Sequence, residues 1–138
     1  MKKRSKITSP PIRQKSGTNS KYERPSWDEY FLAIVDSVGL RSTCDRGGKG
    51  CVITRNNRIL STGYLGSVSG LPHCNEVGHD TKSNYCKRTI HAEHNAITQA
   101  LSFGIPLEDA TMYCEVAPCS ACAKMISSLG IKKIITSK

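Results

Sequence analysis

The chain has 138 residues, of which 38% are hydrophobic, and a formal net charge of +9. That length suits one domain and is too short for two. The sequence has no apolar run of about 18 residues, and no apolar stretch follows its basic N-terminus, so we expect neither a membrane span nor a secretory signal. These features predict a single cytoplasmic domain without a membrane anchor.

Most of the positive charge lies at the N-terminus. Residues 1–24 carry eight of the 20 basic residues and one of the 11 acidic ones, so the rest of the chain is close to neutral. Ser, Thr, Pro and Gly fill the gaps between these charges, as is typical of disordered segments. We therefore predict a basic disordered leader over 1–24 and a folded domain over 25–138. A basic arm that binds nucleic acid or an anionic surface is the alternative.

The cysteine content favours metal binding over disulfides. The chain has seven cysteines, an odd number, and we find no secretion signal. Two of them form a C-x-x-C at Cys119 and Cys122, downstream of an H-x-E that begins at His91. Metal binding in a reducing cytosol explains this arrangement better than a disulfide framework does. Cys51 and Cys114 lie on predicted strands, and we expect them to be small core residues.

The first predicted element is a helix that begins near Pro25 and ends at Gly39. Ser26 followed by Glu29 three residues later is the pattern of a capping box. Apolar residues then recur at helical spacing, namely Trp27, Phe31, Ile34, Val35 and Val38.

Two strands and a long irregular segment follow this helix. Residues 51–54 and 59–62 are predicted strands, and 55–58 between them has the composition of a hairpin turn. Residues 66–89 are rich in Gly, Ser, Asn, His and Cys and show no clear periodicity. An irregular stretch of that length inside a compact domain is usually functional or held in place by another group.

The C-terminal half alternates helices and strands. The predicted elements are a helix over 91–103, a strand over 110–116, a helix over 118–129 with Pro118 in its first turn, and a strand over 131–136. A hairpin followed by this alternation predicts an α/β fold. We expect a three-layer α/β/α sandwich around a mixed central sheet of four to five strands.

The most informative motif is H-x-E followed by P-C-x-x-C. His91, Cys119 and Cys122 offer three zinc ligands and leave a fourth tetrahedral position for water, as in a catalytic zinc site. Zinc lowers the pKa of its water toward ~7, and Glu93 is close enough in sequence to move protons between that water and a substrate. The whole pattern is that of zinc-dependent nucleobase deaminases, which attack a ring carbon that carries an amine and release ammonia.

Each part of this motif also has an ordinary explanation. A single C-x-x-C is often a structural zinc site or a redox pair, and a His at a helix start is often only a cap. Glu93 near a helix N-terminus would interact favourably with the helix dipole. The order of the parts, each at a predicted helix start, favours the catalytic site. We expect His94 to be an ordinary residue of the helix surface.

Further segments outside the zinc motif are distinctive: Arg41–Cys44, Thr62–Tyr64, Ser69–Gly78, Arg88–Glu93, Asn95–Ile97 and Gly130–Lys133. They resemble the deoxycytidylate (dCMP) deaminase family of the cytidine deaminase-like superfamily, from about Arg24 to the C-terminus. The R-S-T-C and G-L-P-H-C segments are specific to this branch. The resemblance implies a sandwich of the cytidine deaminase type, a catalytic zinc, hydrolysis of dCMP to dUMP in pyrimidine deoxyribonucleotide metabolism, and a homo-oligomer.

The resemblance also implies a group of residues that binds the substrate. Arg41, with Ser42 and Thr43, would bind the phosphate of the nucleotide. A guanidinium beside two hydroxyls suits a dianion. Without the resemblance, Arg41 would be explained by a solvated charge at the end of a helix.

Some members of the family carry a second, structural zinc in the long loop. Cys44, Cys74 and Cys86 lie where its cysteines are expected. His79 stands where the family often has Cys, and His is an acceptable zinc ligand. The hypothesis is a second zinc that holds residues 66–89 in place. The alternative is free thiols in a loop held by ordinary packing.

The chain departs from the family near the expected substrate. Leu65 stands in place of an Asn that is expected to hydrogen-bond the sugar, and Tyr85 in place of a His. Lys49 puts a charge at the start of an inner strand. We also expect the C-terminal helix and strand of the family to be missing after Lys138. These changes leave the zinc chemistry intact and alter the substrate pocket, where a lost polar contact costs ~1–3 kcal/mol.

Three functions are therefore weighed. The first is deamination of dCMP. The second is deamination of another nucleotide, a nucleoside or a base in nucleic acid, which Leu65, Tyr85 and the basic arm favour. Among these substrates nucleic acid is disfavoured, because the domain does not alternate aromatic and basic residues as a surface for base stacking would. The third is a metal-stabilised scaffold without turnover. Glu93 argues against it, because a structural site has no need of a carboxylate beside its His.

Overall fold

The computed structural model describes residues 23–46, 49–81 and 86–138. The predicted leader falls almost entirely in 1–22, and these residues, like Tyr85, lie outside the described part. Among the described helices, none is long and apolar enough to cross a membrane. The elements in chain order are α1 (Trp27–Gly39), β1 (Gly50–Arg55), β2 (Arg58–Tyr64), β3 (Gly66–Ser67), α2 (Cys74–Val77), β4 (Thr89–Ile90), α3 (Ala92–Ser102), β5 (Thr111–Cys114), α4 (Ser120–Ser128) and β6 (Lys133–Thr136).

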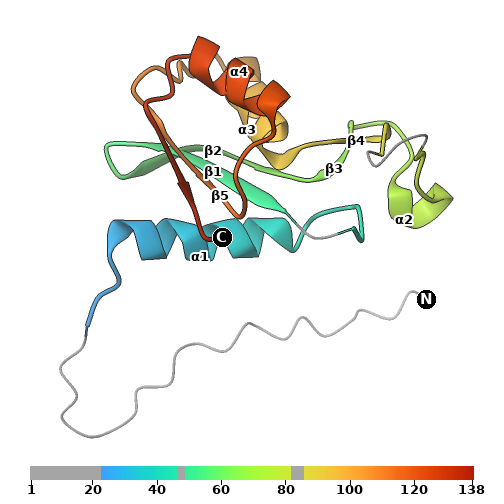
Figure 1. Cartoon of the computed structure of the whole chain (residues 1–138), viewed down its shortest axis with the longest axis horizontal. Helices are drawn as coiled ribbons and strands as arrows, with labels where there is room; N and C mark the ends of the chain where they lie inside the picture. Colours follow the sequence, from blue (N-terminus) through green and yellow to red (C-terminus); the bar gives the residue numbers. More distant parts are fainter. Residues whose placement is uncertain (1–22, 47–48, 82–85) are drawn as a thin grey trace, which may run out of the picture.

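A mixed four-stranded sheet with helices on both faces forms the centre of the fold (Figure 1). Its strand order is β2-β1-β5-β6, with β1 antiparallel to β2 and β5, and β5 parallel to β6. α1 covers one face, and α3 and α4 cover the other. The predicted three-layer α/β/α sandwich is confirmed, with four strands in its central sheet.

The capping box predicted at the start of α1 forms. The Ser26 Oγ accepts the Glu29 N–H at 3.3 Å, and the Ser26 N–H donates to Glu29 Oε2 at 2.8 Å. The backbone hydrogen bond from Ser26, followed by the bond from its side chain, lowers the pKa of Glu29 below its ordinary value. These reciprocal bonds satisfy N–H groups that a helix start leaves without intrahelical partners, so α1 begins where the sequence predicts.

The apolar stripe of α1 buries most of the residues that its spacing predicts. Phe31 and Val35 are fully buried against Val52 and Tyr113 of the sheet. Trp27, which the same spacing places on this face, is instead 52% exposed. Its ring stacks on Phe31 with the centroids 5.7 Å apart, so it covers the core from outside rather than entering it.

The hairpin between β1 and β2 is tighter than the sequence predicts. Asn56 and Asn57 have positive φ angles of 51° and 58°, which is the conformation of a two-residue type I′ turn. Arg55 and Arg58, predicted to lie in the turn, instead pair across the hairpin. Asn tolerates this region of φ better than most residues, so the turn needs only its two central residues.

Gly63 on β2 allows α3 to lie directly on the sheet. A Cβ at this position would clash with the backbone N of Ala96 and the backbone O of Ala92. Beside it, the buried Ser61 Oγ donates to Ala96 O at 2.9 Å. This contact fixes the first turns of α3, which carry the H-x-E motif.

Replacing Gly63 with Ala should lower the free energy of unfolding by about 1–3 kcal/mol, because the added methyl meets helix backbone that cannot turn aside. Denaturant unfolding followed by circular dichroism measures the change. Gly70→Ala measures backbone strain alone, since that glycine has a positive φ of 86° with open space around it. An unchanged free energy of unfolding in Gly63→Ala would contradict the close contact.

Each of the three C-terminal elements, β5, α4 and β6, is shorter than predicted. β5 and β6 pair in parallel only from Thr111↔Lys133 to Cys114↔Thr136. α4 begins at Ser120, so the prediction that Pro118 lies in its first turn is wrong. Cys119 is the N-cap instead, with an extended backbone and a thiol that accepts the Cys122 N–H at 3.5 Å.

The segment over 66–89 is more ordered than its composition predicts. β3 and β4 form a two-stranded antiparallel sheet, and α2 is a helix of a single turn. Together they extend from one end of the central sheet (Figure 1). Strands of two residues and a helix of four are too short to show a hydrophobic period, so sequence periodicity could not detect them.

Candidate active site

The two parts of the zinc motif meet where α3 and α4 begin. His91 Nδ1 lies 3.5 Å from Cys119 Sγ and 3.5 Å from Cys122 Sγ. His91 and Cys119 are the N-caps of their helices, and both have an extended backbone. The ligand atoms of the three residues lie within 4.8 Å of one another. The structure thus brings together the three residues predicted to bind a catalytic zinc.

The spacing and chemistry of these side chains fit a zinc ion. With Zn–S of about 2.3 Å and Zn–N of about 2.0–2.1 Å, a tetrahedral site holds sulfur and nitrogen ligands about 3.5–3.6 Å apart, and the separations found are 3.5 Å. Burial, then the hydrogen bond with Cys119 and the charge of Glu93, raise the pKa of the Cys122 thiol to about 12. A thiolate at Cys122 therefore needs a cation beside it.

Glu93 lies in the first turn of α3, two residues after His91, and only 8% of it is exposed. Its carboxylate is close enough to the buried thiols of Cys51 and Cys122 to raise the pKa of each, after the larger effect of burial. This position beside the ligand cluster differs from that of a solvated charge at a helix start.

A pocket of about 230 Å³ adjoins this cluster. Its lining comes from four separate parts of the chain and consists of Lys49, Leu65, His91, Ala92, Glu93, Val116, Ala117 and Cys119. Pockets for drug-sized ligands occupy roughly 300–1,000 Å³, so this one suits a single heterocyclic base whose substituents extend from the mouth. Sequence reasoning missed Val116 and Ala117. The only sequence feature that could have indicated them is their position just before the C-x-x-C motif.

Two departures from the family pattern, Lys49 and Leu65, line this pocket together. The Leu65 N–H donates to Lys49 O at 3.0 Å, so the backbone joins them across the pocket wall. The preceding residue is also held, because Asn95 on α3 donates from Nδ2 to Tyr64 O at 3.0 Å. The sequence marks both departures but does not show that they face one site.

Arg41, Ser42 and Thr43 are not among the lining residues of the pocket. The Ser42 Oγ donates to Leu65 O at 2.7 Å, and the Thr43 Oγ1 accepts the Ser67 N–H at 3.3 Å. These two hydroxyls hold the segment that carries Leu65. Arg41 is exposed.

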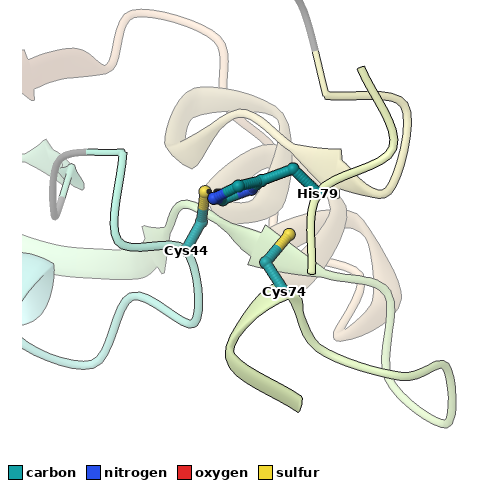
Figure 2. A group of neighbouring side chains, drawn as sticks. All are labelled: Cys44, Cys74 and His79. Carbon is teal, nitrogen blue, oxygen red and sulfur yellow. Dashed lines mark hydrogen bonds between the residues drawn. The ribbon is translucent and has the colours of Figure 1, made fainter. Parts of the chain in front are cut away.

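Three of the four residues predicted to bind a second zinc come together, and the fourth, Cys86, lies next to Cys74 but outside this group. The side chains of Cys44, Cys74 and His79 point toward one another from the loop after α1, from α2 and from the loop after α2, with ligand atoms within 4.8 Å (Figure 2). Cys44 Sγ lies 3.8 Å from His79 Nδ1, and Cys86 Sγ lies 3.7 Å from Cys74 Sγ. Two thiolates on a tetrahedral zinc are about 3.7–3.8 Å apart, so this cluster fits the same ion.

A carboxylate that sequence reasoning missed borders the second cluster. Asp45 Oδ1 lies 2.7 Å from His79 Nε2, while Nδ1 of the same ring is the atom near Cys44. Metal-binding histidines usually donate their other ring N–H to a carboxylate or carbonyl. The position of Asp45 directly after Cys44 was its only sequence signal.

The remaining predictions on single residues are confirmed. Cys51 and Cys114 are fully buried on paired strands, with their Sγ atoms 3.9 Å apart. His94 is exposed on α3, as expected of a surface residue.

Comparison with known proteins shows sequence similarity to deaminases over residues 25–138. The sequence model of the cytidine and deoxycytidylate deaminase zinc-binding region matches residues 25–138. ComE operon protein 2 of Bacillus subtilis (strain 168) is 44% identical over 112 residues, covering 81% of this chain and 59% of that protein. The deoxycytidylate deaminase of Schizosaccharomyces pombe is 36% identical over 120 residues, covering 81% of this chain and 37% of that protein.

A solved structure gives the same result for the fold. The crystal structure of dCMP deaminase from the cyanophage S-TIM5, in complex with dCMP and dUMP, matches with a TM-score of 0.72 and 25% identity over 82% of each chain. The present chain spans 59% and 37% of the lengths of the Bacillus and Schizosaccharomyces relatives. The sequence match, the fold and the paired Cys and His ligands agree, and the chain belongs to the cytidine and deoxycytidylate deaminase family.

Proposed function

We propose that this protein is a zinc-dependent nucleotide deaminase that hydrolyses dCMP to dUMP and ammonia. The observation that carries the proposal is Glu93, a buried carboxylate that lines one pocket together with His91 and Cys119. A metal site that only stabilises a scaffold needs neither a pocket nor a carboxylate that does not bind the metal. Membership of the family supports the same chemistry.

In this proposal His91, Cys119 and Cys122 would hold a zinc ion, and the ion would lower the pKa of water toward ~7 and so supply a nucleophile at neutral pH. Glu93 accepts a proton from the attacking water as the C4–O bond forms, and it delivers that proton to N3 of the ring. A second transfer through Glu93 moves the proton of the new C4 hydroxyl to the amino group. The C4–N bond then breaks as the C4 carbonyl forms, ammonia leaves, and the ring becomes a uracil.

The choice of dCMP rests on relatives. The Schizosaccharomyces protein is named deoxycytidylate deaminase, and the cyanophage enzyme was crystallised with dCMP and dUMP. We propose that the exposed Arg41 contacts the phosphate outside the pocket mouth. Ser42 and Thr43 would act by holding the segment that carries Leu65, since their hydroxyls already bond to its backbone.

Leu65 favours a second candidate, a zinc deaminase of another cytosine nucleotide or nucleoside. Its side chain lines the pocket and offers no hydrogen bond to a sugar. A base in single-stranded nucleic acid fits less well, because stacking on aromatic side chains contributes much of such binding. Within the described part of the chain, the residues that line the pocket include no Phe, Tyr or Trp.

We propose a second, structural zinc bound by Cys44, Cys74, His79 and Cys86. Two of the ligand separations, Cys44 to His79 and Cys74 to Cys86, match a tetrahedral site, and the contact with Asp45 holds the His79 ring with Nδ1 toward the cysteines. Four protein ligands would close this site to water, as in structural zinc centres. The ion would tie the loop after α1 to α2 and to the start of β4.

We further propose a homo-oligomer in the cytoplasm. Zinc-binding thiolates require a compartment that keeps cysteines reduced, and all seven cysteines are unpaired. Leu101 and Phe103 at the end of α3 are 51% and 74% exposed, and apolar side chains of this size are common in subunit contacts.

A panel of substrates tests the activity. We expect the zinc-loaded full chain to turn over dCMP faster than dCTP, CMP, deoxycytidine or a short cytosine-containing single strand, as followed by the absorbance change and by ammonia release. If the protein turns over another compound on the panel and not dCMP, the second candidate function replaces deamination of dCMP. No turnover of any compound would favour the scaffold and reject the enzyme.

A further inference from the structure

Within the part of the chain that the structure describes, Lys49 is the one residue with a fixed positive charge in the lining of the candidate active site. Apart from the zinc ligands and Glu93, its neighbours in that lining are Leu65, Ala92, Val116 and Ala117, whose side chains carry no polar atom. Among these lining residues, a permanently charged side-chain donor for a substrate can come only from Lys49. An anionic group on the substrate would be attracted to the ammonium of Lys49.

The charge of Lys49 is only partly balanced by its surroundings. Its Nζ lies 3.7 Å from Glu115 Oε1, which is an ion-pair distance and beyond an ordinary hydrogen bond. The same oxygen accepts a closer bond of 2.7 Å from Lys138. The hydrogen bond from Lys138 is the main reason that the pKa of Glu115 lies below its ordinary value. Two ammonium groups thus share the Glu115 carboxylate, and Lys49 makes the longer contact with it. Asp36 also lies close enough to Lys138 to raise the pKa of that lysine, after the larger effect of Glu115.

The backbone holds Lys49 in place while its side chain keeps room to move. Leu65 bonds to the Lys49 carbonyl at 3.0 Å. The next residue, Gly50, starts β1 so close to α1 that a Cβ there would clash with Val35 O. The Lys49 side chain itself is 35% exposed. A long, flexible ammonium on a fixed base can follow a phosphate that extends from the pocket mouth.

We propose that Lys49 binds the 5′-phosphate of the substrate and so makes the site selective for a nucleotide over a nucleoside. The inference rests on the proposed deaminase function and adds Lys49 to Arg41 as a residue that binds the phosphate. An ammonium is a compact point charge and a good partner for a phosphate. Glu115 positions it before the ligand arrives. Unlike Arg41, Lys49 lines the pocket that Glu93 lines.

The test compares Lys49→Met with Lys138→Met in the zinc-loaded full chain. Both substitutions remove an ammonium that contacts Glu115, but Lys138 does not line the pocket. We expect Lys49→Met to raise KM for dCMP and weaken dUMP binding about 10- to 100-fold. It should leave deoxycytidine turnover and deoxyuridine binding nearly unchanged. Lys138→Met should change the affinity for dUMP only slightly, and Lys49→Arg should restore most of it.

Three results would overturn the assignment: an equal loss for dUMP and deoxyuridine, an equal loss in the two methionine variants, or no loss in Lys49→Met. The binding measurement by calorimetry does not depend on turnover. If the protein deaminates no cytosine compound but Lys49→Met loses dUMP selectively, the deaminase proposal fails and Lys49 remains a phosphate ligand. If the wild-type protein deaminates dCMP but Lys49→Met shows no selective loss of dUMP, the deaminase proposal stands and the role of Lys49 as a phosphate ligand is rejected.

Discussion

Replacing Glu93 with Gln should lower kcat for dCMP by about 10²- to 10⁴-fold and leave the fold and the zinc content unchanged. Gln has nearly the same size and shape, so the buried position beside Cys122 stays filled. Its amide cannot accept a proton from water and pass it to the ring and the amine, so both proton transfers are lost. Initial rates of ammonia release measure the effect, and metal analysis confirms the zinc.

Glu108→Gln is the matched control, because Glu108 is exposed and does not line the pocket. It should keep wild-type kcat. The Glu93 variant should also bind dUMP with near wild-type affinity, since it loses a proton carrier and not a phosphate ligand. Retention of more than about a tenth of wild-type kcat by Glu93→Gln would contradict a role for this carboxylate in proton transfer.

The purified protein should contain two zinc ions per chain, and Cys74→Ser should contain one. Structural zinc sites contribute large binding free energies, about 10–16 kcal/mol in zinc-finger peptides, and metal binding here is coupled to the order of β3, α2 and β4. We therefore expect the variant to show a lower Tm and faster hydrogen exchange in these three elements. The central sheet should keep its protection, because its core is formed by other residues.

Cys51→Ala is the control for loss of a cysteine, since Cys51 is fully buried in the core and belongs to neither ligand cluster. It should keep two zinc ions, with a cost in stability that spreads over the central sheet. One zinc per chain in the wild-type protein would reject the second site. Two zinc ions in Cys74→Ser would remove Cys74 from the ligand set.

Local features of this fold follow from the sequence with good accuracy. The capping box at Ser26, the Asn56–Asn57 turn and the helix that starts after His91 each depend on residues within a few positions of one another. Backbone conformation at a cap or a turn is decided by such neighbours. The helix and strand patterns in turn predict the order of layers, because each apolar face must be buried against another element.

Other features lie beyond local patterns. β3 and β4 have only two residues each, so no period marks them, and α4 begins after Cys119 because that thiol caps the helix. Trp27 follows the apolar spacing and still remains half exposed. Periodicity is thus absent in the first case, outweighed by a cap in the second, and insufficient to predict burial in the third.

The sequence by itself determined which residues would carry the proposed chemistry. The H-x-E and P-C-x-x-C motifs are recognisable because each has zinc-type ligands at a helix start, which is a local signature. Only the tertiary structure decided what surrounds that chemistry. Lys49, Leu65 and Glu93 come from segments far apart in the chain, and Asp45 reaches His79 across 34 positions. Sheet pairing and helix packing bring such residues together, and these are non-local contacts that no short stretch of sequence encodes.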